Sequence, residues 1–117
     1  MPTYHGQCHC GALQLDLTCQ PITAGKRCNC SVCIRRGVVM SDVYFPPEAF
    51  ARIDGRAALS RYVWGDRDMT SYFCATCGVF VFAEAVAKPG HLRINLGCLD
   101  GIDPLSLAID VIDGRSF

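Results

Sequence analysis

The chain has 117 residues, half of them hydrophobic, and its 11 basic residues balance its 11 acidic ones, so the formal net charge is zero. This composition excludes a disordered chain and predicts one globular domain over residues 1–117. The balanced charge leaves no electrostatic footprint for nucleic acid, and no segment approaches the roughly 18 consecutive apolar residues of a membrane span. We therefore expect neither nucleic acid nor a membrane as a partner.

The N-terminal stretch MPTYHGQCHC has neither a basic start nor an apolar core, so it is not a signal peptide and we expect a cytoplasmic protein. It contains Cys8 and Cys10, whose thiols leave the same face of the chain if this stretch is an extended strand. The following stretch, ALQLDLT (12–18), alternates leucine with other residues and predicts a half-buried strand. Cys19 takes the next position on the leucine face, so we expect it in the core.

Residues 26–37, KRCNCSVCIRRG, place Cys28, Cys30 and Cys33 between two pairs of basic residues. No acidic residue occurs from position 17 to position 41. Part of this positive charge would stabilise thiolates, and the surplus favours an anionic ligand beside them. A solvated basic surface is the alternative interpretation.

The rest of the chain contains short stretches that alternate in polarity or are rich in β-branched and aromatic residues, which predicts strands. These stretches are 38–45, 58–64, 70–74, 79–84 and 91–97. FPPEAFAR (45–52) predicts a single helical turn, since proline fits the first turn of a helix. Cys98 continues the alternation of 91–97 and is expected in the core, with a reactive thiol as the alternative. The pattern as a whole predicts a mainly antiparallel β protein.

Nine cysteines are a heavy load for a chain of this length, and seven of them are clustered. In a reducing compartment, clustered cysteines bind metal or react more often than they form disulfides or pack in a core. FCATCG, which contains Cys74 and Cys77, has the spacing of a zinc knuckle. With Cys8 and Cys10 it supplies four thiolates, which predicts a structural zinc site. Zinc–sulfur bonds of about 2.3 Å would hold neighbouring sulfurs roughly 3.8 Å apart.

The three remaining clustered cysteines, Cys28, Cys30 and Cys33, predict a second zinc site with an incomplete shell. Three protein ligands and one open position are typical of catalytic zinc. The alternative is a closed site completed by a histidine, for which His5 and His9 are the candidates. Each of these histidines is better explained as solvated or hydrogen-bonded.

The pattern GQCHCG, RCNCSVCIRRG, YFCATCG and INLGCLDG, from about Gly6 to Gly101, resembles the glutathione-dependent formaldehyde-activating enzyme family, also named for centromere protein V. The resemblance implies a β-tent fold of small antiparallel sheets joined by zinc ligands. It also implies the division of cysteines given above, with one structural and one catalytic zinc. The implied activity forms S-hydroxymethylglutathione from glutathione and formaldehyde, which in reverse is a carbon–sulfur lyase reaction.

We therefore expect a zinc-dependent carbon–sulfur lyase whose partner is a small thiol such as glutathione. Arg35 and Arg36 would bind a carboxylate of that thiol. The aromatic side chains of Tyr62, Trp64 and Tyr72 are candidates for the wall of the site. The alternative function is a non-catalytic, zinc-stapled module whose basic stretch docks a protein or another acidic partner.

Overall fold

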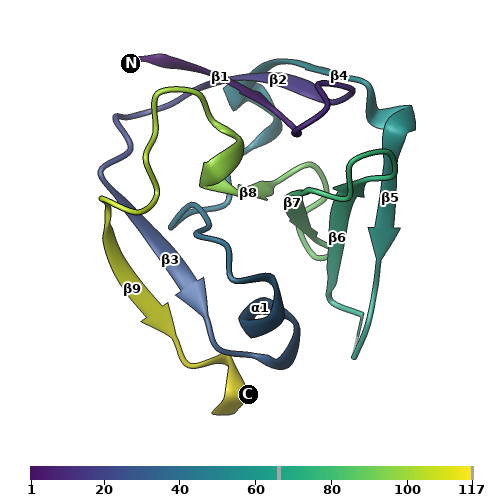
Figure 1. Ribbon diagram of the computed structural model, residues 1–117, viewed down its shortest axis with the longest axis vertical. Coiled ribbons are helices and arrows are strands. Elements are labelled where there is room, and N and C mark those ends of the chain that lie inside the picture. Colours follow the sequence, from purple (N-terminus) through teal and green to yellow (C-terminus); the bar gives the residue numbers. More distant parts are fainter. Residues whose placement is uncertain (66, 117) are drawn as a thin grey trace.

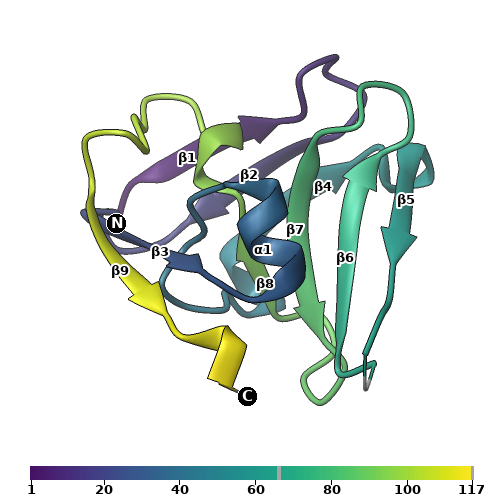
Figure 2. The same ribbon diagram turned by 60° about the horizontal axis from the view of Figure 1, so that its bottom comes forward.

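A computed structural model describes residues 1–65 and 67–116 of the chain. In this part of the chain the strands form three small sheets, shown in Figure 1 as an upper sheet, a pair at the lower left and a sheet at the right. A short helix, α1, lies between the lower-left pair and the right-hand sheet in both ribbon views (Figures 1 and 2). The prediction of a mainly β fold with small antiparallel sheets is confirmed.

The first sheet has the order β1 (Thr3–Gln7), β2 (Gln14–Thr18) and β4 (Phe50–Asp54), with antiparallel neighbours. The predicted strand at 12–18 is confirmed and begins at Gln14. Its leucines are fully buried, whereas Asp16 lies on the opposite face. There the Asp16 carboxylate accepts a hydrogen bond of 2.8 Å from Nε of Arg52. The period-two pattern of this strand therefore separates the core face from a charged outer face.

The second sheet pairs β3 (Ala24–Cys28) with β9 (Ala108–Ile112), and the two strands run parallel. Neither strand was predicted, and their parallel pairing departs from the expected antiparallel arrangement. β3 carries the sequence AGKRC, which has no alternation of apolar and polar residues. Its partner lies more than 80 residues further along the chain, from residue 108. Long-range backbone hydrogen bonds, rather than a local pattern, define this pair.

The third sheet is antiparallel and has the order β5 (Leu59–Tyr62), β6 (Met69–Cys74), β7 (Phe80–Ala85) and β8 (Leu92–Ile94). The strands predicted at 58–64, 70–74 and 79–84 are confirmed. β8 is shorter than the predicted 91–97, because the chain turns into a 3₁₀ helix at Leu96–Cys98. In this turn the side chain of Asn95 accepts a hydrogen bond from the amide of Gly97.

The predicted strand at 38–45 is wrong, because this segment forms only isolated bridges, at Met40 and at Phe45. The segment instead separates two cavities: Ser41 and Val43 line one, and Met40 and Tyr44 line the other. An expected helical turn is present nearby as a 3₁₀ helix at Pro47–Ala49.

α1 (Ser31–Arg36) is a six-residue helix, too short to give a helical periodicity in the sequence. It ends at Gly37, whose φ of 67° is a left-handed conformation that favours glycine. Further short 3₁₀ turns lie at Arg56–Ala58 and Gly114–Ser116. None of the helices in the described part of the chain is long and apolar enough to span a bilayer.

The main core lies between the first and third sheets and is built from β2, β7 and β8 with the segments that flank them. Its fully buried members include Leu13, Leu15, Leu17, Val81, Phe82, Leu92, Ile94 and Leu96. Cys19 and Cys98 are 8% and 5% exposed, which confirms the expectation that both are buried. Neither of them, and none of the other seven cysteines, forms a disulfide bond.

Candidate metal centres and the adjoining cavity

The first cysteine cluster joins the first sheet to the third. Cys8 and Cys10 lie in the turn after β1, Cys74 ends β6, and Cys77 lies in the turn before β7. The Sγ atoms of all four lie within 4.8 Å of one another. The Cys8–Cys10 and Cys10–Cys74 sulfur distances are 3.7 and 3.6 Å, close to the roughly 3.8 Å of a tetrahedral zinc site. The donor set and its spacing therefore fit a structural zinc ion.

The expectation that Cys8 and Cys10 sit on a strand is wrong, since β1 ends at Gln7 and the two cysteines lie in a turn. The turn still brings the sulfurs together, and its backbone amides point at them. The amide of Leu13 donates to Sγ of Cys8 at 3.4 Å. A backbone hydrogen bond from Val79 is the main cause that lowers the pKa of Cys77 to about 6. These amides stabilise thiolates, which are the form that binds a metal.

The second cluster lies at the junction of β3 and α1. Cys28 ends β3, Cys30 is the residue before the helix, and Cys33 lies in its first turn. Their Sγ atoms also lie within 4.8 Å of one another, and all three residues are partly buried. The amide of Cys30 donates to Sγ of Cys28 at 3.4 Å. Burial is the main cause that raises the pKa of Cys33 to about 12, followed by the neighbouring thiols.

This second cluster has three ligands within the described residues, because no histidine, cysteine or carboxylate there joins it as a fourth. The two candidate histidines lie elsewhere. His5 bonds to the carboxylate of Asp16 through Nδ1, and His9 is exposed in the turn between the cysteines of the first cluster. Three thiolates with one position left open fit a zinc ion that can take a further ligand.

A feature that the sequence did not reveal is the C-terminal turn that covers the second cluster. The side chain of Asn29 donates to Oδ1 of Asp113 and accepts from the amide of Arg115, each at 3.0 Å. Gly114 is thereby pressed against the cysteines. A Cβ atom added to it would lie 2.5 Å from Sγ of Cys28. The turn packs on the cluster, and Gly114 also lines the cavity beside it.

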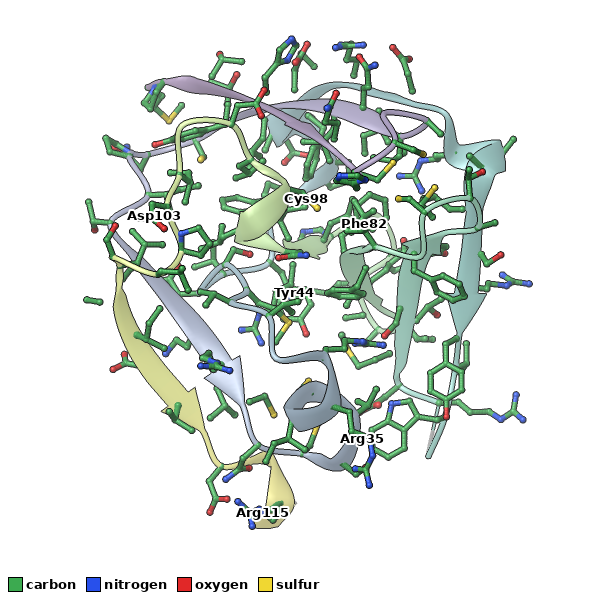
Figure 3. All side chains as sticks on the ribbon, in the orientation of Figure 1. Arg35, Tyr44, Phe82, Cys98, Asp103 and Arg115 are labelled. Carbon is green, nitrogen blue, oxygen red and sulfur yellow. The ribbon has the colours of Figure 1, made fainter. Side chains whose placement is uncertain are left out.

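The second cluster lies at the wall of a cavity of about 560 Å³. Among the described residues, its lining combines apolar and aromatic side chains with two arginines and one acid. Besides the three cysteines it includes Arg36, Met40, Tyr44, Trp64, Asp68, Met69 and Arg93. In Figure 3, Tyr44 lies near the centre of the molecule, above α1 and below Phe82. The cavity therefore lies between the helix and the third sheet.

The sequence and the fold are both similar to those of known proteins. A sequence profile described as glutathione-dependent formaldehyde-activating enzyme matches residues 3–111. The chain belongs to this family. A crystal structure of a Rhodobacter sphaeroides protein, a structural genomics target, is similar, with a TM-score of 0.77 and 28% sequence identity. The similarity covers 92% of this chain and 99% of that one.

In this member of the formaldehyde-activating family, Arg36 lines the cavity, whereas the neighbouring Arg35 lies on the exposed surface of the helix. The guanidinium of Arg36 lies 4.2 Å from the ring centroid of Phe80 and lines the cavity. Burial lowers the pKa of Arg36, so this cation is partly withdrawn from water. Arg35 is exposed and donates from Nη1 to the carbonyl of Ser31 at 2.8 Å, which ties it back onto the helix. Of the two predicted arginines, the structure thus brings only Arg36 to the cavity beside the cysteines.

Of the three predicted aromatic wall residues, Trp64 lines the cavity and is 38% exposed at its rim. Tyr62 is 50% exposed and is not among the described lining residues. Tyr72 lies on the opposite side of the sheet, where its ring packs against Phe82 at 5.4 Å between centroids. Its hydroxyl hydrogen-bonds to Glu84.

Proposed function

We propose that Cys28, Cys30 and Cys33 hold a catalytic zinc ion and that the adjoining cavity binds a small thiol such as glutathione. The proposed activity is that of a carbon–sulfur lyase of the S-hydroxymethylglutathione synthase type. The observation that carries the proposal is a cluster of three sulfurs, with no fourth ligand in the described residues, at the wall of a 560 Å³ cavity. Membership in the formaldehyde-activating family supports the same substrate pair.

The proposed reaction joins the substrate sulfur to the carbonyl carbon of formaldehyde, and the thiol proton ends on the former carbonyl oxygen. When bound, zinc supplies a Lewis acid that lowers the pKa of a thiol. Arg36 would orient a substrate carboxylate, because its position against the Phe80 ring fixes the guanidinium before the substrate arrives. Met40, Met69 and Trp64 give the cavity apolar walls that limit water around the reacting atoms.

The first cluster has a different proposed role, as a structural zinc site formed by Cys8, Cys10, Cys74 and Cys77. Its four sulfurs leave no position for a substrate. The clustered cysteines, read as metal ligands rather than disulfides, agree with a reducing compartment, and we propose the cytoplasm. The alternative, a binding module with two closed sites, would need a fourth protein ligand at the second cluster.

Cobalt in place of zinc tests the proposal, because its absorption spectrum changes when a fourth sulfur enters the shell. Glutathione should change the spectrum of the wild-type protein. Cys30→Ser retains the first cluster and should show no response, which assigns the change to the second. The catalysed exchange between free glutathione and its formaldehyde adduct should be measured by NMR alongside. A cobalt spectrum that ignores every thiol would favour the binding module.

A further inference from the structure

Arg93 is a cavity residue that the sequence analysis did not single out. It is the middle residue of β8, between the fully buried Leu92 and Ile94, so its side chain leaves the opposite face of the sheet. On that face it is the end of a row across three strands, since Ser71 pairs with Ala83 and Ala83 pairs with Arg93. All three residues of the row line the cavity. The two small side chains leave this part of the cavity wall open, and the arginine reaches the segment that contains Asp42 and Tyr44.

The guanidinium of Arg93 is held in place but its charge is not neutralised. It lies 4.6 Å from the ring centroid of Tyr44, and Nη2 makes only a long hydrogen bond of 3.4 Å to the carbonyl of Asp42. Its Nε is buried and has no hydrogen-bond partner. Among residues 1–65 and 67–116, no carboxylate forms an ion pair with Arg93 or with Arg36. Within the described residues, the cavity therefore contains two arginines that form no ion pair with a carboxylate, although Arg36 also faces the thiols of Cys30 and Cys33.

A buried donor without a partner costs free energy, and a cation withdrawn from water costs more. Each arginine also stacks on an aromatic ring, which fixes its orientation at little further entropy cost. Such fixed guanidinium groups match the planar, two-oxygen geometry of a carboxylate. The lining also contains Asp68, whose negative charge opposes every anion and most strongly one that concentrates two charges on a single group, as phosphate does. A carboxylate ligand is the chemistry that satisfies both observations.

We propose that Arg93 is a specificity-determining residue that binds a carboxylate of the thiol substrate from the wall of the third sheet. The identity of the ligand as a thiol rests on the proposed function, whereas the anion site does not. Arg36 lies on the α1 side of the same cavity and Arg93 on the sheet side. A thiol that carries two carboxylates can therefore be held at both walls, while one without carboxylates leaves both arginines unpaired.

Calorimetric binding of S-methylglutathione to the metal-loaded protein tests this inference without using the thiol. The methyl group caps the sulfur, and the diethyl ester of the same compound removes both carboxylate charges. Wild-type protein should bind the acid at least about tenfold more tightly than the ester. Arg93→Gln should weaken binding of the acid about tenfold and leave the ester unchanged. Arg93→Lys, which keeps the charge, should give an intermediate affinity.

Arg61→Gln is the matched control, because Arg61 is an exposed arginine on β5 outside the cavity lining. It should bind both compounds like the wild type. Retained zinc content and thermal midpoint would show that Arg93→Gln is folded. The inference is overturned if Arg93→Gln weakens acid and ester equally, if it weakens neither, or if wild type does not bind S-methylglutathione.

The outcome is separable from that of the cobalt experiment. A cobalt spectrum that ignores glutathione, together with Arg93-dependent binding of S-methylglutathione, would reject the proposed function and keep the anion site. A cobalt spectrum that responds to glutathione, together with an Arg93→Gln variant that binds S-methylglutathione like the wild type, would keep the proposed function and reject the anion site.

Discussion

The sulfur atoms of Cys10 and Cys74 lie 3.6 Å apart although 64 residues separate them in the chain. Cys10 follows the first strand of the first sheet, and Cys74 ends a strand of the third. A metal ion at this point would therefore fix the two sheets to each other. A metal ion at the second cluster would not join two sheets in this way, because its three cysteines all lie within residues 28–33.

The two clusters should differ in their contribution to folding. Structural zinc contributes on the order of 10 kcal/mol to the folding free energy of small metal-dependent domains. Cys10→Ser and Cys77→Ser should therefore abolish the cooperative thermal transition followed by circular dichroism. Cys30→Ser should leave a folded protein with a sharp transition. Equal losses of thermal midpoint in both clusters would contradict the division of roles.

Zinc analysis of the purified protein should give two ions per chain, one bound much more tightly than the other. Four thiolates form a closed shell, whereas three leave a position that exchanges with solvent. Cys30→Ser should retain the tighter ion and lose the weaker one. A single ion that survives this substitution would leave the second site without support.

Gly114→Ala should weaken the second metal site selectively. The added methyl group would lie 2.5 Å from Sγ of Cys28 and 2.9 Å from Cβ of Cys30, so either the C-terminal turn or a ligand must move. Zinc bound at the second cluster should transfer to a chromogenic chelator faster in this variant than in the wild type. The ion of the first cluster is the internal control and should leave at the wild-type rate. Unchanged transfer of both ions would show that the turn shifts without disturbing the ligands.

Arg36→Ala should reduce the preference of the cobalt protein for glutathione over mercaptoethanol, which has no carboxylate. A charge-assisted contact is worth roughly 1.5–3 kcal/mol when shielded and less when exposed, so for this partly buried arginine the preference should fall by about tenfold. Arg35→Ala should keep the preference, because this side chain is bound to the carbonyl of Ser31. An equal effect of both substitutions would mean that general positive charge, rather than the position of Arg36, attracts the ligand.

Cys98 should produce part of the alkaline loss of stability. Burial is the main cause that raises the pKa of this thiol from 9.0 to about 12. The folded state therefore holds the proton more tightly than the unfolded chain. The contribution of Cys98 to stability is complete below pH 9.0 and is lost as the pH rises toward about 12.

Urea unfolding from pH 8 to pH 11 would check this effect, with each pH unit worth at most about 1.4 kcal/mol. Cys98→Ala should show a shallower fall in unfolding free energy with pH than the wild type. Leu99→Ala, a neighbouring core truncation with no titrating group, should lower stability by a similar amount at every pH. Parallel curves for wild type and Cys98→Ala would contradict the raised pKa.

Local sequence patterns determined those parts of this protein in which neighbouring residues carry the information. The leucines of 12–18 predict a buried strand face, because side chains alternate with a period of two along an extended chain. The pairs at Cys8 and Cys10 and at Cys74 and Cys77 indicate metal ligands, because their spacing allows two sulfurs to meet at one ion. The family resemblance rests on these same local motifs.

Contacts between distant segments determined the β3–β9 pair and the wall of the cavity. β3 has no pattern of its own and exists because β9 pairs with it from the other end of the chain. Arg93 alternates with two buried residues, so the sequence alone places it on an outward, solvated face. Only the tertiary structure packs α1 and Tyr44 over that face and turns it into a cavity wall. Periodicity reports which face a side chain leaves, and the packing of other elements decides whether that face meets water.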